Sequence, residues 1–241
     1  DNGRYRGVDI HADQYPYTAS YTGLGVLLPS WAFDGEGWRE KLHDPAFRRR
    51  LLQHVANVIR HERAGHDLDR IRIAQCAQEP AMEGKGLGEI LTAEHQHPSA
   101  ENAAELVIRL LSKGQASAVY RTMSEEDVEN IMKNPLVMIA SDGHIPEKNV
   151  GALHPRNYGT FPRVLSVYVR EKNLLTLEEA IHKMTGMVAD RLGLQERGHI
   201  SPGKRADLVI FDAEKIRDNA TFASPHEYPE GIDYVLVNGE M

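Results

Sequence analysis

The sequence has little cysteine and no long apolar segment. Its 241 residues include one cysteine, Cys76, which by itself cannot form an intrachain disulfide or a multi-cysteine zinc site. Such cysteine usage is typical of a reducing compartment, so we expect a cytoplasmic protein. The longest apolar runs, residues 136–140 and 208–211, fall far below the roughly 20 residues of a membrane-spanning helix. We therefore expect no membrane span.

An excess of basic charge is also missing. The chain has 28 Lys and Arg residues against 35 Asp and Glu, with a net charge of -7, and no basic stripe of the kind that binds nucleic acid. We therefore expect no nucleic-acid partner. No signal peptide is visible, and the chain starts at Asp1 without a methionine, which suggests that residues precede it. The 41% apolar content suits one large domain, or one domain and a piece of another.

Hydrophobic spacing predicts strands and helices in the first half of the chain. Apolar and polar residues alternate over residues 8–12, which predicts a strand before the turn-rich residues 14–18. Asp44 and Pro45 are a typical N-cap and first-turn pair, and the apolar spacing behind them predicts a helix of about four or five turns. We expect a further strand over residues 71–74 and a helix over residues 99–111 that stops at Gly114.

A helix and a buried strand lead to Asp142. Ser124 predicts the N-cap of a short helix that Pro135 ends. Residues 136–140 are continuously apolar, as a strand buried on both faces requires, and the run ends at Asp142-Gly143. This order is that of an α/β unit whose loop lies at the C-terminal end of the strand.

The last third begins with the clearest helix of the sequence. Thr176 and Glu179 form a capping box, and apolar residues continue at helical spacing to Leu192, with Gly193 as the predicted stop. Short strands replace helices after that point. We expect them over residues 206–211 and 232–237, the second closed by Asn238-Gly239.

Asp142 is the first candidate for chemistry. Its position after a buried strand delivers a carboxylate to the sheet edge where barrel enzymes place their catalytic groups. An Asp-Gly turn with no function explains the same two residues equally well. The motif alone leaves both interpretations open.

Two other motifs carry groups suited to a small ligand. The first is His154-Pro155-Arg156, because an arginine fork can donate two parallel hydrogen bonds to a planar carboxylate. The second is the segment after the first strand, where the hydroxyls of Tyr15, Tyr17 and Ser20 could reach a ligand. A surface loop for Arg156, and aromatic packing beneath a loop for Tyr17, are the structural alternatives.

Three patterns resemble binding motifs but do not fit them. His95 and His97 lie in a polar link between helices, which favours a solvated connector. His61 and His66 are five residues apart and would not share a helix face, as a zinc-binding pair must. Residues 84–88 are glycine-rich but lack the spacing and Ser/Thr of a phosphate-binding loop, so we expect a flexible connector.

Taken in order, the motifs resemble the second half of a D-aminoacylase (N-acyl-D-amino-acid deacylase) of the amidohydrolase superfamily. Each stretch is weak alone, but the series is specific and covers nearly the whole chain. The matching stretches are residues 12–20, 123–128, 139–143, 154–165, 184–185, 191–194, 197–203, 206–212 and 220–222.

The resemblance implies an α/β fold: the C-terminal part of a (β/α)8 TIM-type barrel, followed by the last strands of a small β-sandwich. Residues 1–193 would belong to the barrel, with a family insertion over about residues 21–114, and residues 194–241 to the sandwich. A complete barrel takes about 250 residues. An N-terminal barrel segment, in cis or as another chain, is therefore the implied partner.

The implied activity is hydrolysis of the amide bond of N-acyl-D-amino acids by a water activated by one or two zinc ions. Asp142 would be the general acid/base and the one candidate metal ligand in this chain, because the family's other ligands lie upstream of Asp1. Arg156, Tyr17, Ser20 and His154 would bind the substrate. The alternatives are a hydantoinase, dihydroorotase or isoaspartyl dipeptidase activity, or a non-catalytic fragment or subunit.

Overall fold

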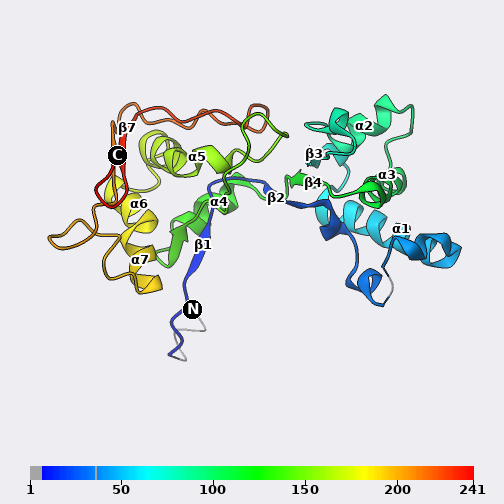
Figure 1. Ribbon diagram of the computed structural model, residues 1–241, viewed down its shortest axis with the longest axis horizontal. Helices are drawn as coiled ribbons and strands as arrows, with labels where there is room; N and C mark the ends of the chain where they lie inside the picture. Colours follow the sequence, from blue (N-terminus) through cyan, green and yellow to red (C-terminus); the bar gives the residue numbers. More distant parts are fainter. Residues whose placement is uncertain (1–6, 36) are drawn as a thin grey trace. The chain divides into compact units, whose positions relative to one another are not determined.

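The computed structural model describes residues 7–35 and 37–241. They form two compact units (Figure 1). Unit 1 consists of the segments Asp1–Tyr17, Ser124–Pro146 and Pro155–Met241, and unit 2 of Thr18–Met123 and Glu147–His154. Each helix within residues 7–35 and 37–241 is too short or too polar to span a bilayer.

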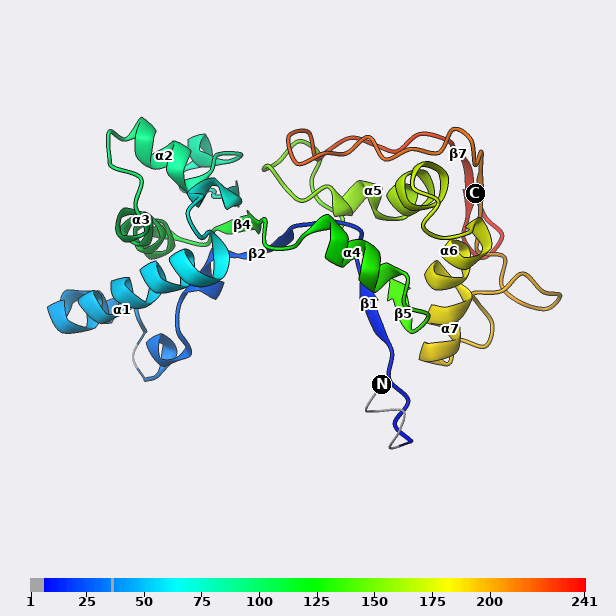
Figure 2. The same cartoon turned by 180° about the vertical axis from the view of Figure 1, so that it is seen from behind.

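Two short parallel strands form the sheet of unit 1 that leads to Asp142 (Figure 2). Strand β1, Ala12–Gln14, pairs with β5, Val137–Ile139, so that Ala12 lies opposite Val137. The strand predicted over residues 8–12 is wrong in its position, because Val8 and Ile10 are exposed and outside any strand. The backbone becomes a strand only where β5 offers a partner.

Helices pack around this pair of strands. Helix α4, Glu125–Met132, starts at the predicted N-cap Ser124, whose hydroxyl accepts from the N–H of Asp127 at 3.1 Å. Helix α5, Arg156–Arg163, continues into a π-helix, Val164–Glu171. The small apolar core beneath them contains Val128, Met132, Ile139, Val164, Leu165, Tyr168, Leu175, Ala180 and Ile216.

The long helix predicted after Thr176 is two helices. The capping box is confirmed, but α6 ends at Met184 (Leu177–Met184) and α7 spans Gly186–Leu192. Thr185 breaks the helix with φ -132° and ψ -86°, and its hydroxyl donates to the Ile181 carbonyl at 2.7 Å. A methyl group on Gly186 would lie 2.6 Å from the His199 ring, so the chain turns where only glycine fits.

The two C-terminal strands form an antiparallel hairpin. They are β6, Leu208–Phe211, and β7, Ile232–Leu236. Both were predicted, as was the turn after them, where Asn238 and Gly239 have positive φ angles. The segment between these strands runs along α5, as the orange and red ribbon of Figure 1 shows.

Unit 2 is a three-stranded antiparallel sheet covered by helices. The strand order is β2 (Ser20–Gly23), β4 (Ser117–Tyr120), β3 (Ile71–Gln75). Its α-helices are α1 (Pro45–Val58), α2 (Leu87–Ala93) and α3 (Ala100–Lys113). A π-helical turn, Ile59–Arg63, follows α1. Short 3-10 segments occupy Leu24–Leu27, Ser30–Phe33, Glu40–His43, Leu68–Arg70 and Pro80–Met82.

Capping residues confirm the predicted helices of unit 2. Asp44 accepts from the N–H of Ala46 at 2.8 Å, and Ser99 accepts from the N–H of Asn102 at 3.1 Å. The prediction of a flexible connector is wrong for residues 86–88, because Gly86 is the N-cap of α2 and its N–H donates to Glu89 Oε2 at 2.7 Å. The Asp69 carboxylate lies 2.1 Å from where a side chain on Gly86 would start, so packing rather than flexibility explains that glycine.

Candidate functional site

The candidate site lies where β1 and β5 end. Because the two strands are parallel, their C-terminal ends share one edge of the sheet. The ladder continues as far as the N–H of Ala140, which donates to Gln14 O at 3.0 Å. Tyr15 follows β1 directly, and Asp142 lies three residues after the end of β5. The sequence therefore brings an aromatic hydroxyl and a carboxylate to the same edge.

The backbone presents Asp142 in an unusual conformation. Its φ is +47°, which for a non-glycine residue costs on the order of 1–3 kcal/mol and tends to occur at functional sites. Neighbouring groups hold this turn: Gly143 N–H donates to Ser141 Oγ at 3.2 Å, and His144 N–H to Asn157 Oδ1 at 3.1 Å. The Asp142 side chain is 69% exposed, so its carboxylate is open to solvent.

Arg156 is the buried partner of this carboxylate. It is the first residue of α5, its side chain is 5% exposed, and its Nη2 lies 2.9 Å from Asp142 Oδ2. Its guanidinium carbon lies 5.1 Å from the centre of the Tyr15 ring. A buried charge needs such partners, because leaving it unpaired is costly. The structure thus brings together two residues that the sequence proposed separately.

The sequence analysis placed the hydroxyls of Tyr15 and Tyr17 within reach of a ligand, but it included only Tyr17 among the substrate-binding residues. Burial raises the pKa of Tyr15, and the negative charge of Asp142 adds to that rise while the nearby Arg156 opposes it. Its hydroxyl therefore keeps its proton at neutral pH. The signal was present, but the motif does not say which tyrosine faces the arginine.

Tyr17 makes a different set of contacts. It is buried, and its hydroxyl donates to Asp218 Oδ2 at 3.1 Å. Burial raises the pKa of Tyr17, and the Asp218 charge raises it further. Burial also raises the pKa of Asp218, although the hydrogen bonds that it accepts from Ala220 N–H and from Tyr17 lower this pKa in part. Its predicted contact with a substrate stays a prediction.

The other two predicted residues belong to unit 2. Ser20 begins β2 and lies opposite Tyr120 of β4. His154 is fully buried, with Nε2 2.9 Å from the carbonyl oxygen of Ala19. Because they belong to a different unit from Asp142 and Arg156, their predicted part in the same site stays a prediction.

A metal site is not completed by the residues that the structure describes. Within 7–35 and 37–241, no three His, Cys, Asp or Glu side chains are grouped so that they could hold a metal ion. His95 and His97 are exposed in the link after α2, as predicted, and His61 and His66 are exposed as well. Burial raises the pKa of Cys76, which disfavours the thiolate form that binds metals.

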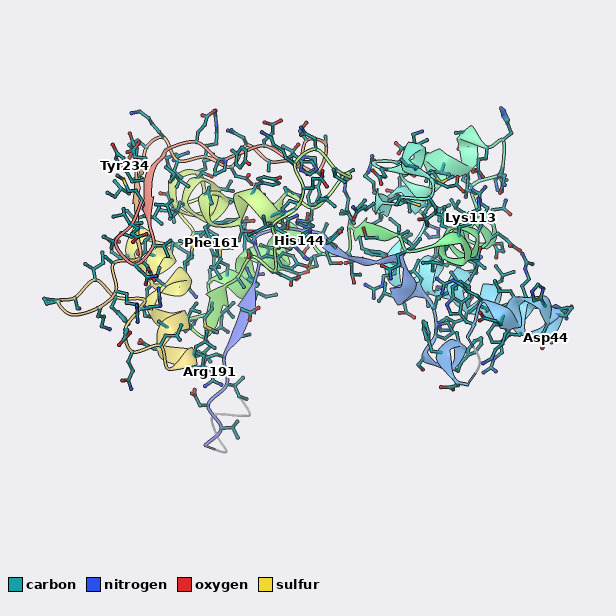
Figure 3. All side chains as sticks on the ribbon, in the orientation of Figure 1. Asp44, Lys113, His144, Phe161, Arg191 and Tyr234 are labelled. Carbon is teal, nitrogen blue, oxygen red and sulfur yellow. The ribbon has the colours of Figure 1, made fainter. Side chains whose placement is uncertain are left out.

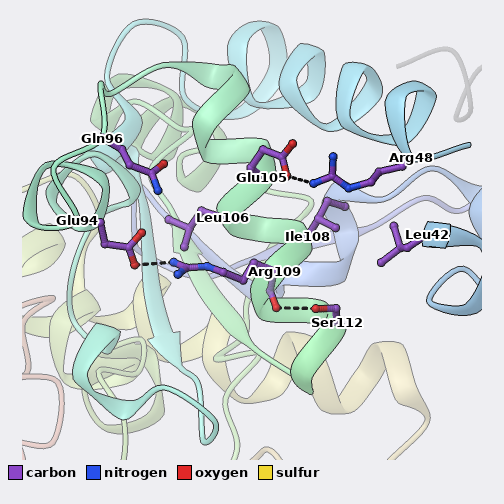
Figure 4. Close-up of a pocket in the computed structure, with 9 residues that line it drawn as sticks. All are labelled: Leu42, Arg48, Glu94, Gln96, Glu105, Leu106, Ile108, Arg109 and Ser112. Carbon is purple, nitrogen blue, oxygen red and sulfur yellow. Dashed lines mark hydrogen bonds and ion pairs between the residues drawn. The ribbon is translucent and has the colours of Figure 1, made fainter. Parts of the chain in front are cut away.

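A cavity in unit 2 also lacks suitable chemistry. It measures about 390 Å³ and lies over α3 (Figure 4). Its charged groups neutralise each other, since Arg109 pairs with Glu94 at 2.5 Å and Arg48 pairs with Glu105. Paired charges at a surface give a ligand little to bind. The edge that carries Asp142 and Arg156 is therefore the better candidate.

Comparison with known proteins supports the family suggested by the motifs. A model of the amidohydrolase family matches residues 42–241. An N-acyl-D-glutamate deacylase of Alcaligenes xylosoxydans xylosoxydans is 35% identical over 239 residues, which cover 99% of this chain and 39% of that protein.

Two solved structures agree with this match. One is an N-acyl-D-glutamate deacylase of Bordetella bronchiseptica, complexed with zinc and a phosphonate that mimics the tetrahedral intermediate. It is 32% identical with a TM-score of 0.70, and the match covers 98% of this chain and 40% of that one. A D-aminoacylase with a binuclear metal centre is 33% identical with a TM-score of 0.70, over 99% and 40%. This chain thus spans about 40% of the length of these relatives.

Proposed function

Since this chain belongs to the amidohydrolase family, we propose that the protein hydrolyses the amide bond of N-acyl-D-amino acids, with Asp142 as general acid/base. The observation that carries the proposal is the pairing of an exposed carboxylate with a buried arginine at the ends of two parallel strands. The relatives that cover this chain are deacylases, and nothing in the geometry favours a cyclic amide or a dipeptide instead.

Asp142 and Arg156 would divide the chemistry between them. Asp142 takes a proton from the attacking water and hands it to the leaving amine, which is general acid/base catalysis. Arg156 holds the α-carboxylate of the substrate, because a planar guanidinium can donate two parallel hydrogen bonds to a carboxylate. Roles for Tyr17, Ser20 and His154 in substrate binding remain part of the proposal.

The described residues, 7–35 and 37–241, do not form a complete zinc site: they contain no group of three metal-binding side chains, and Asp142 pairs with Arg156. We propose that the one or two zinc ions of the enzyme are held mainly by a further barrel segment, in cis or on another chain. The relatives support this, since about 40% of their length is matched here.

The same relatives support a proposal for the fold. β1 and β5 would be late strands of a (β/α)8 barrel, since a long insertion separates them in sequence while they pair in parallel. Unit 2, which contains residues 21–114, would be that insertion. The hairpin of β6 and β7 would lie in a small β-sandwich formed by residues 194–241.

The test compares two substrates in the complete, zinc-loaded enzyme. If Arg156 grips the α-carboxylate, Arg156→Ala should lower kcat/KM for N-acetyl-D-methionine about 30- to 1000-fold, which corresponds to about 2–4 kcal/mol of transition-state binding. Lysine should restore part of this, because it cannot form the two-pronged contact.

N-acetyl-D-methioninamide, which lacks the carboxylate, is the control. We expect it to be a poor substrate that Arg156→Ala affects little. Equal losses on acid and amide would make Arg156 a structural residue and contradict the assignment.

A further inference from the structure

The C-terminal segment reaches the loop that carries Tyr15. In Figures 1 and 2 the segment between β6 and β7 runs along α5. At one point it places Asp218 against Tyr17, whose hydroxyl donates to Asp218 Oδ2 at 3.1 Å across 201 residues of sequence. The ring of Phe222 meets the Tyr17 ring edge-on, with centroids 6.2 Å apart. Tyr17 is therefore held by its hydroxyl and by its ring.

Helix α5 is shaped to admit this carboxylate. A methyl group on Gly159 would lie 1.8 Å from Asp218 Oδ1, so no side chain fits at that position. Glycine weakens a helix interior, and its presence here is explained by the close approach of Asp218. Gly159, within the motif at 154–165, thus lies against Asp218, although the two residues are far apart in sequence.

The loop between β1 and Tyr17 is fixed at successive residues. Arg163 Nε donates to the carbonyl oxygen of Pro16 at 2.8 Å, and its guanidinium carbon lies 5.1 Å from the Tyr17 ring centre. Asp218 holds the Tyr17 hydroxyl. Tyr15, two residues earlier, lies beneath the guanidinium of Arg156. A loop fixed on one side presents its other side chains in one geometry.

We propose that Asp218 is a positioning residue of the active site, which acts through the Tyr17 hydroxyl to hold the Tyr15 ring beneath Arg156. Asp218 also accepts from the N–H of Ala220 at 2.9 Å, so its own carboxylate is fixed by the local turn. The kinetic part of this inference rests on the proposed deacylase function, whereas the structural part does not.

The chain offers a matched control for the local turn. Asp212 accepts from the N–H of Glu214 at 2.9 Å, the same two-residue turn that Asp218 makes with Ala220. Asp212→Ala therefore removes an equivalent turn in the same segment without touching Tyr17. The test variants are Asp218→Ala, Asp218→Asn, which keeps an acceptor oxygen, and Tyr17→Phe, which keeps the ring and removes the donor.

The first measurement is hydrogen exchange of the amides of residues 15–20 in the complete enzyme. Loss of one buried hydrogen bond should speed exchange there about fivefold or more in both Asp218→Ala and Tyr17→Phe. Asp212→Ala should leave it at the wild-type rate, and Asp218→Asn should come close to it. Because Tyr17→Phe preserves the packing, it tests the role of the Tyr17–Asp218 hydrogen bond even if Asp218→Ala does not fold.

The second measurement separates KM from kcat on N-acetyl-D-methionine. In Asp218→Ala and Tyr17→Phe, a displaced Tyr15 ring should weaken the binding of the substrate carboxylate by Arg156 in the ground state and the transition state alike. We therefore expect KM to rise about tenfold while kcat changes less than about threefold. The Asp218→Ala/Tyr17→Phe double variant should lose no more than either single one, because both break the same contact.

Unchanged exchange in Tyr17→Phe would overturn the proposal. So would faster exchange with an unchanged KM, since Asp218 would then stabilise the loop without serving the site. A wild-type enzyme without deacylase activity would contradict the proposed function instead. The exchange rates alone would then show whether Asp218 fixes the loop.

Discussion

The two units use their interiors differently. Unit 2 buries a large cluster of apolar side chains between its sheet and α1 and α3, among them Leu51, Ile73 and Leu110. Unit 1 has a smaller apolar cluster but buries the polar or charged side chains of Arg156, Lys183, Thr160 and Ser166, whereas unit 2 buries that of His154. Buried polar and charged groups lower stability unless they are paired, yet they are what a site requires. Unit 1 therefore contains the candidate site and unit 2 the larger apolar core.

The surfaces of the two units also differ in which side chains they expose. In unit 1 the hairpin exposes apolar side chains on both strands, including Tyr234, whose place is labelled in Figure 3. In unit 2 the helix termini carry polar groups, such as Asp44 at the start of α1 and Lys113 at the end of α3, both labelled in the same view. A two-stranded hairpin is only marginally stable by itself and needs a covering layer, so mutations in the two units should have different effects.

The largest expected effect is on catalysis. In the complete enzyme, Asp142→Asn should lower kcat about 10²–10⁴-fold, because it removes the proton-transferring carboxylate. Melting temperature and zinc content should stay close to the wild-type values. Glu94→Gln, which breaks an ion pair in the unit 2 cavity, is the matched control, and we expect kcat to be unchanged. A loss under tenfold for Asp142→Asn would favour a structural strand-to-turn role.

The next effect concerns stability. Leu110→Ala removes a fully buried side chain from the large core of unit 2, and we expect a loss of about 3–5 kcal/mol in the free energy of unfolding. Leu175→Ala, in the smaller core of unit 1, should cost less, about 2–3 kcal/mol. Urea unfolding of the two variants gives the comparison, and equal losses would mean that the cores contribute alike.

A pH dependence should separate the units as well. Lys183 of unit 1 is buried and donates to the carbonyl oxygens of Asn134 at 2.6 Å and Val137 at 2.8 Å. Burial lowers the pKa of Lys183, so between that pKa and the usual value of about 10.4 the unfolded chain binds more protons. Stability therefore rises with pH across this window.

The measurement is the urea midpoint between neutral pH and about pH 10. Lys183→Met should flatten the rise, whereas Lys113→Met in unit 2, whose ammonium pairs with Glu79 at the surface, should retain it. Parallel profiles for the two variants would contradict the role assigned to Lys183.

The smallest expected effect comes from two glycines. Alanine normally stabilises a helix relative to glycine, but Gly159→Ala should destabilise the protein by about 1–3 kcal/mol, because its methyl group overlaps Asp218. Gly25 of unit 2 has open space around it, so Gly25→Ala should change stability by less than about 1 kcal/mol. Differential scanning calorimetry would measure both changes. A stabilising Gly159→Ala would contradict the close contact between residue 159 and Asp218.

Local features of the sequence determined much of the secondary structure. Asp44, Ser99, Ser124 and Thr176 each cap the helix that follows, because a cap depends on residues one turn apart. The apolar run before Asp142 became β5, and the hairpin closed at Asn238-Gly239 as predicted. These are short-range effects that a single sequence displays.

Only the tertiary structure decided which distant residues meet. Tyr15 and Arg156 are brought together by the pairing of β1 with β5 and by the start of α5, and the contact of Tyr17 with Asp218 spans most of the chain. The break at Thr185 and the need for glycine at 159 depend on neighbours that arrive from elsewhere in the sequence. Capping and periodicity act over a few residues, whereas packing joins side chains whose separation in sequence carries no trace of the contact.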